Sequence, residues 1–541
     1  MQTLLIQYIC LILIIVGLVM IAQKLRVAYP IILVLGGLLL SLINAFPTIT
    51  IDPDLVFFIF LPPLLYEAAW QTSWKEFWKW RRVIMSFAFP IVILTSTVVA
   101  VVSQAIIPGF SWALGFLLGG IVSPPDAISA TTIMRTVRVP KQIVSIAEGE
   151  SLLNDASSLI VFRFALAAVL TGQFALREAA TSFVLVVVMG ILIGLAIGMF
   201  VYAIHRFLPT TASIDIVLSF VTPYCLYYVA EEFHYSGVLA VVSGGLLLSH
   251  KRHTMLTHLS RIQGANVWST VGFVLNGLVF LLIGLELPAI VTQLNTINIS
   301  TAIGYGLIIS LALIVTRLLC TLGASLFTRF MSQFITVAQA NPGWKAPVIL
   351  GWAGMRGVVS LAAALSIPVL LDRGHPFPQR DLILFITFVV ILVTLVFQGF
   401  TLPWVIRKVA IDDDQALLPD DQQRAIIQRK LAQTALDFLA NNYPDAVDDN
   451  AYVSNLKSRL AVDVSYFSTL NQPGNPSGLP ENVLADHQRI ALELLDSQRS
   501  LLHRINNRME FDEYLIRKYL FILDLEETKL REKQLPLDNL A

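Results

Sequence analysis

Residues 119–132 read GGIVSPPDAISATT, and this stretch decides the fold. It lies inside an apolar segment, at about 112–136, that is long enough to cross a membrane as a helix. Pro124 and Pro125 remove two amide donors and clash with the preceding turn, so a regular helix cannot continue through them. Asp126 follows directly and carries a charge that is costly in lipid. We therefore predict a membrane helix that breaks near Ser123.

The composition around this stretch is that of a membrane protein. The chain has 541 residues, of which 56% are hydrophobic and 14% are charged, and its mean hydropathy is +0.72. Apolar segments of about 20 residues cross the hydrocarbon core of a bilayer as helices. We therefore expect an all-α polytopic membrane protein. Its thirteen expected spans lie at about 3–23, 27–45, 55–70, 83–107, 112–136, 147–171, 178–204, 214–231, 237–250, 266–290, 300–328, 346–371 and 382–406.

The charges separate the chain into two parts. Residues 1–410 hold 23 basic and 15 acidic side chains, whereas residues 411–541 hold 14 basic and 22 acidic side chains. The sparse charge of the first part suits lipid, and the dense charge of the second suits water. We predict a transmembrane domain at 1–410 and an acidic, helical cytoplasmic domain at 411–541.

The orientation follows from the basic residues of the loops. With thirteen spans, 17 of the 23 basic residues in 1–410 fall on one side of the membrane and three on the other. Positive charge concentrates in cytoplasmic loops. We therefore expect an extracellular N-terminus and a cytoplasmic C-terminal domain. Four tryptophans alternate with basic residues after the third span, as in an interfacial anchor, and they lie at 70, 74, 78 and 80.

Nine charged residues fall inside the expected spans. Each would cost about 2.5 to 3.5 kcal/mol on insertion scales, so each needs a partner, a water-filled cavity or a function. The set does not suit a purely structural scaffold. Arg163 and Glu286 lie near the outer ends of their spans, where they can snorkel to the interface. The nine are Glu67, Asp126, Glu148, Glu150, Asp155, Arg163, Glu286, Arg317 and Arg356.

A second broken helix is expected in the twelfth span. Residues 350–368 read LGWAGMRGVVSLAAALSIP, in which three glycines flank Arg356. The fifth and twelfth spans hold matching places in two six-helix sets of opposite direction, which is the pattern of an inverted repeat. Asp126 can neutralise the N-terminal ends of the half-helices, and Arg356 the C-terminal ends. Direct ion ligation remains open for both residues.

The sixth span contains the candidate ion site. Residues 148–163 read EGESLLNDASSLIVFR, and Ser151 and Asp155 lie four residues apart on one helix face. They offer oxygen ligands for a monovalent cation. Burial disfavours the charged form of Asp155, so that a proton and a cation compete for one negative charge. The alternative is a neutral carboxyl group held by a hydrogen bond. Glu150, on the adjoining face with Asn154, is expected to form a buried ion pair with Arg317.

These motifs resemble the monovalent cation:proton antiporter-1 family, the sodium/hydrogen exchangers of bacteria and eukaryotes. The resemblance covers about residues 1–410. It rests on FFIFLPPLLYEAAW at 57–70 with Glu67, SPPDAISA with Asp126, GESLLNDA with Asn154 and Asp155, IVTRLL with Arg317, and GMRGVVSLA with Arg356. The Asn-Asp pair is the most specific of these signals.

The resemblance implies thirteen helices, a homodimer and an elevator-like alternating-access motion. It implies an ion site formed by Asp155 with Ser151, Glu67 and the unwound part of the fifth span. An Asn-Asp pair in place of two aspartates is associated with electroneutral one-for-one exchange. Many relatives have Thr where this chain has Pro125, so Ser123 or a backbone carbonyl is expected to replace that ligand.

We therefore expect a secondary antiporter, not an enzyme, that exchanges Na⁺, or K⁺ or Li⁺, for H⁺ in the cytoplasmic membrane. A gated cation channel and an organic-anion symporter are the alternative classes. No cofactor and no nucleic-acid partner is expected, since the sequence carries no phosphate-binding loop or metal-ligand spacing. In the acidic domain we expect helices at 418–441, 447–470 and 482–534, a linker at 471–481, and a regulatory or dimer-contacting role.

Overall fold

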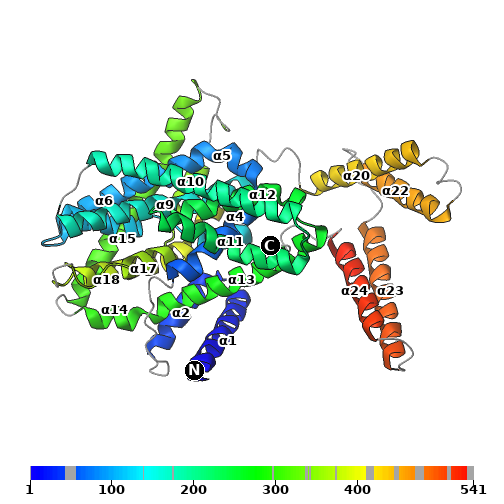
Figure 1. The fold of residues 1–541 in the computed structure, drawn as a ribbon, viewed down its shortest axis with the longest axis horizontal. Coiled ribbons are helices and arrows are strands. Elements are labelled where there is room, and N and C mark those ends of the chain that lie inside the picture. The colour runs from blue at the N-terminus through cyan, green and yellow to red at the C-terminus, as the bar shows by residue number, and fades with distance from the viewer. Residues whose placement is uncertain are drawn as a thin grey trace. The chain divides into compact units, whose positions relative to one another are not determined.

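A computed structural model describes most of the chain. The described residues are 2–42, 56–137, 139–172, 176–294, 298–334, 339, 343–371, 375–409, 420–443, 450–469, 481–507 and 513–532. Nearly all of them are helical (Figure 1). The chain divides into two compact units, Met1–Ile411 and Asp412–Ala541.

Apolar helices make up the first unit. Among the described residues, eight helices are long and apolar enough to cross a membrane, and α2 and residues 9–25 of α1 are shorter apolar helices. The unit is therefore a multi-pass membrane domain. Its first helices are α1 (Gln2–Leu25), α2 (Tyr29–Leu42), α4 (Leu61–Gln71), α5 (Trp74–Ser86), α6 (Val92–Ile106), α7 (Trp112–Val122), α8 (Ala127–Val137) and α9 (Lys141–Thr171). The later ones are α10 (Leu176–Phe207), α11 (Ala212–Glu232), α12 (Gly237–Met255), α13 (His258–Leu285), α14 (Leu287–Gln293), α15 (Ile299–Met331), α16 (Lys345–Trp352), α17 (Val358–Leu365), α18 (Arg380–Leu392) and α19 (Gly399–Val409).

The fourth expected span begins earlier than predicted. Residues 74–106 form one continuous helix, in which a π-helical turn at Phe87–Ile91 accommodates Pro90 between α5 and α6. The Trp-rich stretch predicted as an interfacial anchor thus runs directly into the span. Trp74 and Trp78 are exposed, as an anchor needs, but Trp80 is buried against the protein.

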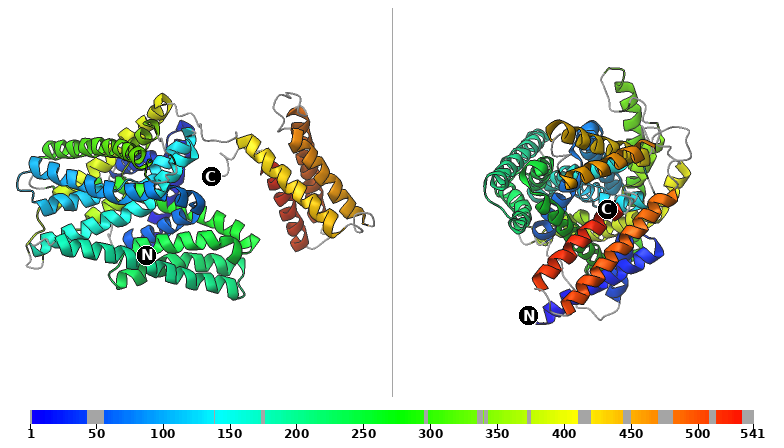
Figure 2. Two further views of the ribbon diagram at one scale, coloured as in Figure 1. Left: turned by 90° about the horizontal axis from the view of Figure 1, so that it is seen from above. Right: turned by 90° about the vertical axis from the view of Figure 1, so that its right-hand side faces the viewer.

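Outward-facing helix surfaces are apolar. On α10, exposed side chains recur every three to four residues at Val184, Leu185, Val188 and Leu192. Such a stripe would be unfavourable in water and suits lipid. In the left view of Figure 2, α10, α12 and α13 lie along one edge of the unit, and α10 packs against α12.

Two glycines bring α7 into backbone contact with its neighbours. A Cβ atom on Gly119 would lie 2.9 Å from the Cα of Ser96 on α6. A Cβ atom on Gly120 would lie 2.8 Å from the backbone nitrogen of Phe162 on α9. Neither position has room for a side chain. The first half of the broken helix is therefore packed tightly between α6 and α9.

The described residues of the second unit form two helix pairs. α20 (Asp420–Asn442) packs against α22 (Ala451–Thr469), and α23 (Glu481–Asn507) packs against α24 (Glu513–Glu532). The prediction of one helix at 482–534 was wrong, because α23 ends at Asn507 and packs against a separate helix, α24, that begins at Glu513. Arg499 of α23 forms ion pairs with Asp524 at 2.7 Å and Glu527 at 2.5 Å. The predicted linker at 471–481 lies, except for its last residue, outside the described residues.

Candidate functional site

Two helix breaks meet in the first unit. α7 ends at Val122 and α8 begins at Ala127, while α16 ends at Trp352 and α17 begins at Val358. Both predicted interruptions are confirmed. The amide nitrogen of Asp126 donates a hydrogen bond to the carbonyl oxygen of Met355 at 2.6 Å. The two extended segments therefore cross each other at this point.

Asp126 lies at the N-terminal ends of two half-helices. Its carboxylate accepts hydrogen bonds from the amide of Ile128 at 3.1 Å and the hydroxyl of Ser129 at 2.9 Å, at the start of α8. A Cβ atom on Gly357, which precedes α17, would lie 2.8 Å from the Cβ of Asp126. Helix N-termini carry partial positive charge. The aspartate thus lies where its charge offsets two such ends.

Arg356 lies at the opposite ends and is fully buried. Its Nε donates to the carbonyl oxygen of Val122, the last residue of α7, at 2.9 Å. Its guanidinium also bonds the carbonyl oxygen of Gly354, just after α16. Its backbone nitrogen donates to the hydroxyl of Thr394 at 3.1 Å. The arginine therefore satisfies carbonyl groups that the interrupted helices leave without partners.

Glu150 and Arg317 form a bidentate ion pair inside the protein. The distances are 2.8 Å from Nη1 to Oε1 and 2.9 Å from Nη2 to Oε2, and both side chains are at most 5% exposed. The Nε of Arg317 also donates to the carbonyl oxygen of Leu350 at 3.3 Å. One arginine on α15 therefore joins α9 to the first half of the second broken helix.

The polar residues of α9 hold the first break in place. The side-chain amide of Asn154 donates to the carbonyl oxygen of Pro125 at 2.8 Å. The hydroxyl of Ser151 accepts a hydrogen bond from the amide of Ala127 at 3.3 Å. Asn154 and Ser123 are buried and do not line the cavity described next. The candidate ligands predicted from the sequence are thus only partly brought together.

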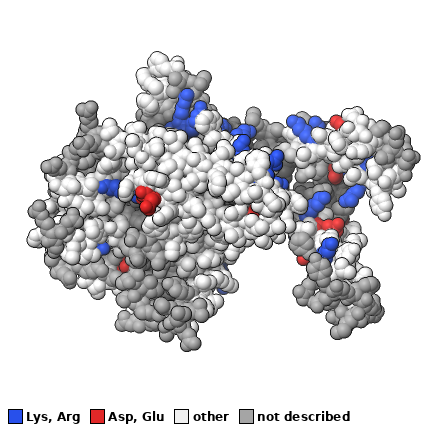
Figure 3. Space-filling view, viewed as in Figure 1, with Lys and Arg blue, Asp and Glu red and all other residues white. Residues whose placement is uncertain are grey.

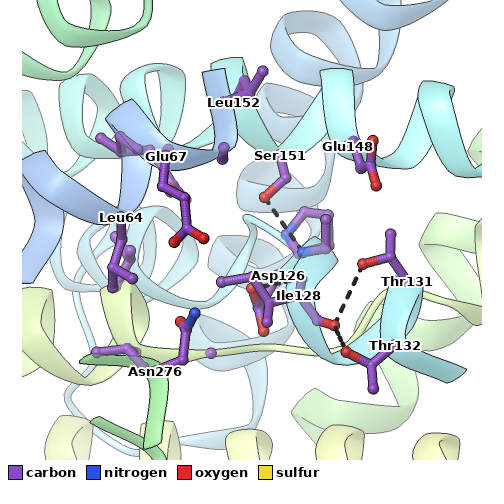
Figure 4. Close-up of a pocket in the computed structure, with 18 of the residues that line it drawn as sticks. Leu64, Glu67, Asp126, Ile128, Thr131, Thr132, Glu148, Ser151, Leu152 and Asn276 are labelled. Carbon is purple, nitrogen blue, oxygen red and sulfur yellow. Dashed lines mark hydrogen bonds between the residues drawn. The ribbon is translucent and has the colours of Figure 1, made fainter. Parts of the chain in front are cut away.

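A cavity of about 340 Å³ lies beside the crossing point (Figure 4). Four of the predicted residues line it, and they are Glu67, Asp126, Ser151 and Asp155. Asp155 is 8% exposed, and its carboxylate has no hydrogen bond or ion pair with any of the residues that the structure describes. Asp155 therefore differs from Asp126 and Glu150, whose charges are offset by protein groups.

The wall opposite the crossing comes from α4 and α13. Glu67 of α4 accepts a hydrogen bond from Gln71 at 3.0 Å, and its carboxylate lies directly against Gly272 of α13. Asn276, one turn further along α13, also lines the cavity. Figure 4 shows Glu67, Asn276 and Asp126 pointing into the same space. We did not predict Asn276, and its only sequence signal is one amide in an apolar span.

An ion pair lies at the more exposed end of this cavity. Arg135 Nη2 and Glu148 Oε1 are 3.0 Å apart, with side chains 49% and 29% exposed. Because Asp155 is far less exposed, the cavity leads from this pair inward to the buried carboxylate. Its lining has four carboxylates against one guanidinium, which favours cations over anions.

Other charged groups have partners or burial that the sequence did not predict. Arg163 does not simply snorkel, since its Nη2 lies 2.6 Å from Oε2 of Glu231 on α11. Glu286 is only 5% exposed, so the snorkelling prediction was wrong for this residue. A buried pair between α10 and α11 was not predicted from the sequence. In it, Nδ1 of His205 lies 2.7 Å from Oδ1 of Asp215. The described residues contain no group of three or more His, Cys, Asp or Glu side chains suited to a metal ion.

The sequence model of a known family matches residues 10–408, and its description is sodium/hydrogen exchanger, transmembrane. The chain belongs to the sodium/hydrogen exchanger family. The match covers the broken helices, the acidic cavity and both buried arginines, so the resemblance predicted from the motifs is confirmed.

Curated relatives carry related names. The chain is 35% identical over 428 residues to the sodium, potassium, lithium and rubidium/H⁺ antiporter of Bacillus pumilus, an alignment of 76% of this chain and 62% of that protein. The chain therefore spans less than two thirds of that relative. It is 30% identical to an uncharacterized Na⁺/H⁺ exchanger of Escherichia coli, over 90% of this chain and 92% of that protein.

A solved structure has the same fold. It is the sodium proton antiporter MjNhaP1 from Methanocaldococcus jannaschii, with a TM-score of 0.58 over 76% of this chain and 99% of that one. The sequences are 16% identical, so this likeness concerns the fold alone.

Proposed function

We propose that the chain is a secondary active antiporter that exchanges a monovalent cation for protons across the cytoplasmic membrane. The observation that carries this proposal is the cavity that leads to Asp155. Its carboxylate is buried, lines the cavity and has no partner within the described part of the chain. A buried negative charge without a protein counter-ion requires either a proton or a cation. Competition for such a site couples the two fluxes.

The way in which the carboxylates near the crossing are neutralised supports one-for-one exchange. Asp126 faces helix N-termini, and Glu150 pairs with Arg317. Asp155 is thus the carboxylate left to alternate between protonated and cation-bound forms. Each form is neutral at this residue, so the exchange is electroneutral.

The proposed ligand set combines side-chain and backbone oxygens. Asp155 and Ser151 lie on one face of α9, and Glu67 faces the same cavity from α4. Pro124 and Pro125 also line the cavity, so backbone carbonyls at the break replace the missing threonine hydroxyl. Ser123 does not line the cavity and is a weaker candidate. Oxygen ligands suit Na⁺, and the name of the Bacillus pumilus relative includes sodium, potassium and lithium. K⁺/H⁺ exchange by the same mechanism is the alternative.

Alternating access would change which side of the membrane the cavity faces. The first six and the last six of thirteen spans would form inverted repeats, with α7–α8 and α16–α17 in matching places. The N-terminus would be outside, and residues 411–541 would form a cytoplasmic helical domain. Arg135 would then lie on the cytoplasmic side, so the cavity would be open inward. An elevator-like motion in a homodimer would move Asp155 and the crossing relative to Glu67 and Asn276.

Proteoliposomes with a pH-sensitive dye test this proposal. An imposed Na⁺ gradient should drive protons uphill, and collapsing the membrane potential should not stop this exchange. A gated channel cannot drive protons uphill in response to a cation gradient. Repeating the assay with K⁺ and Li⁺ would establish the cation preference.

Asp155→Asn tests the single-site mechanism. This change removes the competing charge but breaks no hydrogen bond among the described residues, so exchange should stop while the protein still folds. Glu232→Gln, at an exposed acidic position of α11, serves as the control and should leave exchange unchanged. Cation-dependent proton flux in the Asp155→Asn protein would contradict the mechanism.

A further inference from the structure

The membrane unit has a second cavity, separate from the acidic one. It has a volume of about 450 Å³ and is formed by the last turns of α5, the start of α9, the end of α15 and the start of α16. It shares no lining residue with the cavity that contains Asp155. None of its described lining residues is acidic. The proposed transport function assigns no role to it.

Basic side chains of α5 border this cavity. Lys79, Arg81 and Arg82 all line it, and Figure 3 shows Lys and Arg side chains gathered near the protruding end of the unit. The Lys79 ammonium lies 5.2 Å from the ring centroid of Trp80, and the Arg81 guanidinium lies 4.5 Å from that of Trp78. Basic and indole groups together are typical of the headgroup level of a membrane.

The walls of the cavity behave as apolar surface despite several hydroxyl groups. Ser86, Thr321 and Thr328 donate to backbone carbonyls of their own helices at 2.8, 3.1 and 2.8 Å. Ser325 donates to the carbonyl oxygen of Gly343 at 2.7 Å. These donors are already used. The walls are completed by apolar residues such as Ile143, Ile146 and Leu350.

The surroundings of the cavity are exposed and apolar, as suits a surface that faces lipid. Trp78 is 53% exposed, and on α15 Phe327 is 63% and Phe330 is 56% exposed. Phe327 also lines the cavity, so its wall continues into this apolar surface. The cavity therefore combines cations at the headgroup level with apolar walls open toward the acyl chains.

We propose that this cavity binds one anionic phospholipid. The phosphate would lie against Lys79, Arg81 and Arg82, and an acyl chain would occupy the space between α9 and α15. Basic pockets between membrane helices attract anionic headgroups, and apolar walls add the burial of methylene groups. A free phosphate ion carries at least as much negative charge but has no chain to bury, so it should bind far more weakly.

Native mass spectrometry of the purified full chain tests this proposal with phosphatidylglycerol as the anionic probe and phosphatidylcholine as the neutral one. The wild-type protein should retain phosphatidylglycerol preferentially. Lys79→Gln combined with Arg81→Gln should weaken its binding about 30-fold, because each nearby cation contributes about 1 kcal/mol. The matched control is Arg407→Gln with Lys408→Gln at the end of α19, where Lys408 lies 4.7 Å from the Trp404 ring. The control should bind phosphatidylglycerol as the wild type does.

A second variant tests the contribution of the cavity to lipid binding separately from that of the basic side chains. Ala324→Trp places an indole in the cavity without altering any charge, and it should also displace the lipid. If that variant does not fold, the two charge variants still decide the matter. The proposal is overturned if Lys79→Gln with Arg81→Gln binds phosphatidylglycerol as tightly as the wild type does. It is overturned equally if the α19 control loses as much, or if inorganic phosphate competes as well as the lipid.

Discussion

Replacing Arg317 by Gln should be among the most destabilising single changes in the membrane unit. Its guanidinium makes both short bonds to Glu150 and a third to the carbonyl oxygen of Leu350. Removing one member of a buried pair costs about 3–5 kcal/mol, because the other charge stays buried without a partner. The exposed pair of Arg163 and Glu231 has a similar distance of 2.6 Å, yet such pairs contribute about 0–1 kcal/mol.

The difference can be converted into a melting temperature. Unfolding entropy is about 2.1 cal/mol/K per residue, so the unit Met1–Ile411 gives about 0.9 kcal/mol/K. Arg317→Gln should therefore lower the midpoint by about 3–6 °C, and Arg163→Gln by about 1 °C or less. Thermal unfolding of both purified variants in one detergent measures this, by intrinsic fluorescence. Equal shifts in the two variants would refute the reasoning.

Charge reversal of the pair adds a separate expectation. Glu150→Arg with Arg317→Glu restores opposite charges, so it should recover part of the expression lost in either single variant. Recovery should be incomplete, because a glutamate at 317 cannot donate to Leu350. A double variant no better than the single ones would show that the pair does not act through its charges.

Three further changes have defined outcomes. Gly357→Ala should slow cation exchange at least tenfold, because its Cβ would push Asp126 from the start of α17. Gly304→Ala, with no atoms near its Cβ, is the control in the same transport assay. Equal exchange rates in the two variants would contradict the capping role of Asp126. Arg135→Gln should lower the cation concentration for half-maximal exchange about threefold, because it frees the Glu148 carboxylate at the cavity mouth. A rise in this concentration would contradict the prediction. In the second unit, Arg531 and Arg499 hold the pKa of Glu527 below its usual range. The ion pairs of Glu527 therefore stabilise the packing of α23 against α24 at pH values above the unfolded pKa, near 4. This stabilisation is lost as the pH falls through the lower folded pKa. Hydrogen exchange of the full chain should show faster exchange in α23 and α24 on acidification, with a smaller acid response in Glu527→Gln than in the exposed-site control Glu526→Gln.

The sequence predicts the local features of the site better than its long-range contacts. Two adjacent prolines remove two amide donors from one turn, so the interruption after Val122 follows from Pro124 and Pro125, whereas the single Pro90 is accommodated inside a continuous helix. The crossing of the two helix breaks cannot be predicted from local sequence in this way. It depends on the hydrogen bond between Asp126 and Met355, which are far apart in the chain.

Single polar residues give too little sequence signal to be assigned. Asn276 is one amide in an apolar helix, and only the fold reveals that it lies across from Asp126. Arg163 lies near the end of a span, where snorkelling is the usual solution, but α11 happens to place Glu231 within reach. The separation of α23 from α24 escaped prediction because charged residues continue a helical pattern in both helices.

The backbone contacts at Gly119 and Gly120 restrict how any conformational change can occur. Side chains can change rotamers when helices slide, but two backbones in direct contact have no such freedom. In the proposed alternating access we therefore expect α6, α7 and α9 to move as one rigid block, together with Asp155 on α9. The opposite wall, with Glu67 and Asn276, meets this block across a cavity. In the proposed motion, the cavity is thus also the place where we expect this block to slide past α4 and α13.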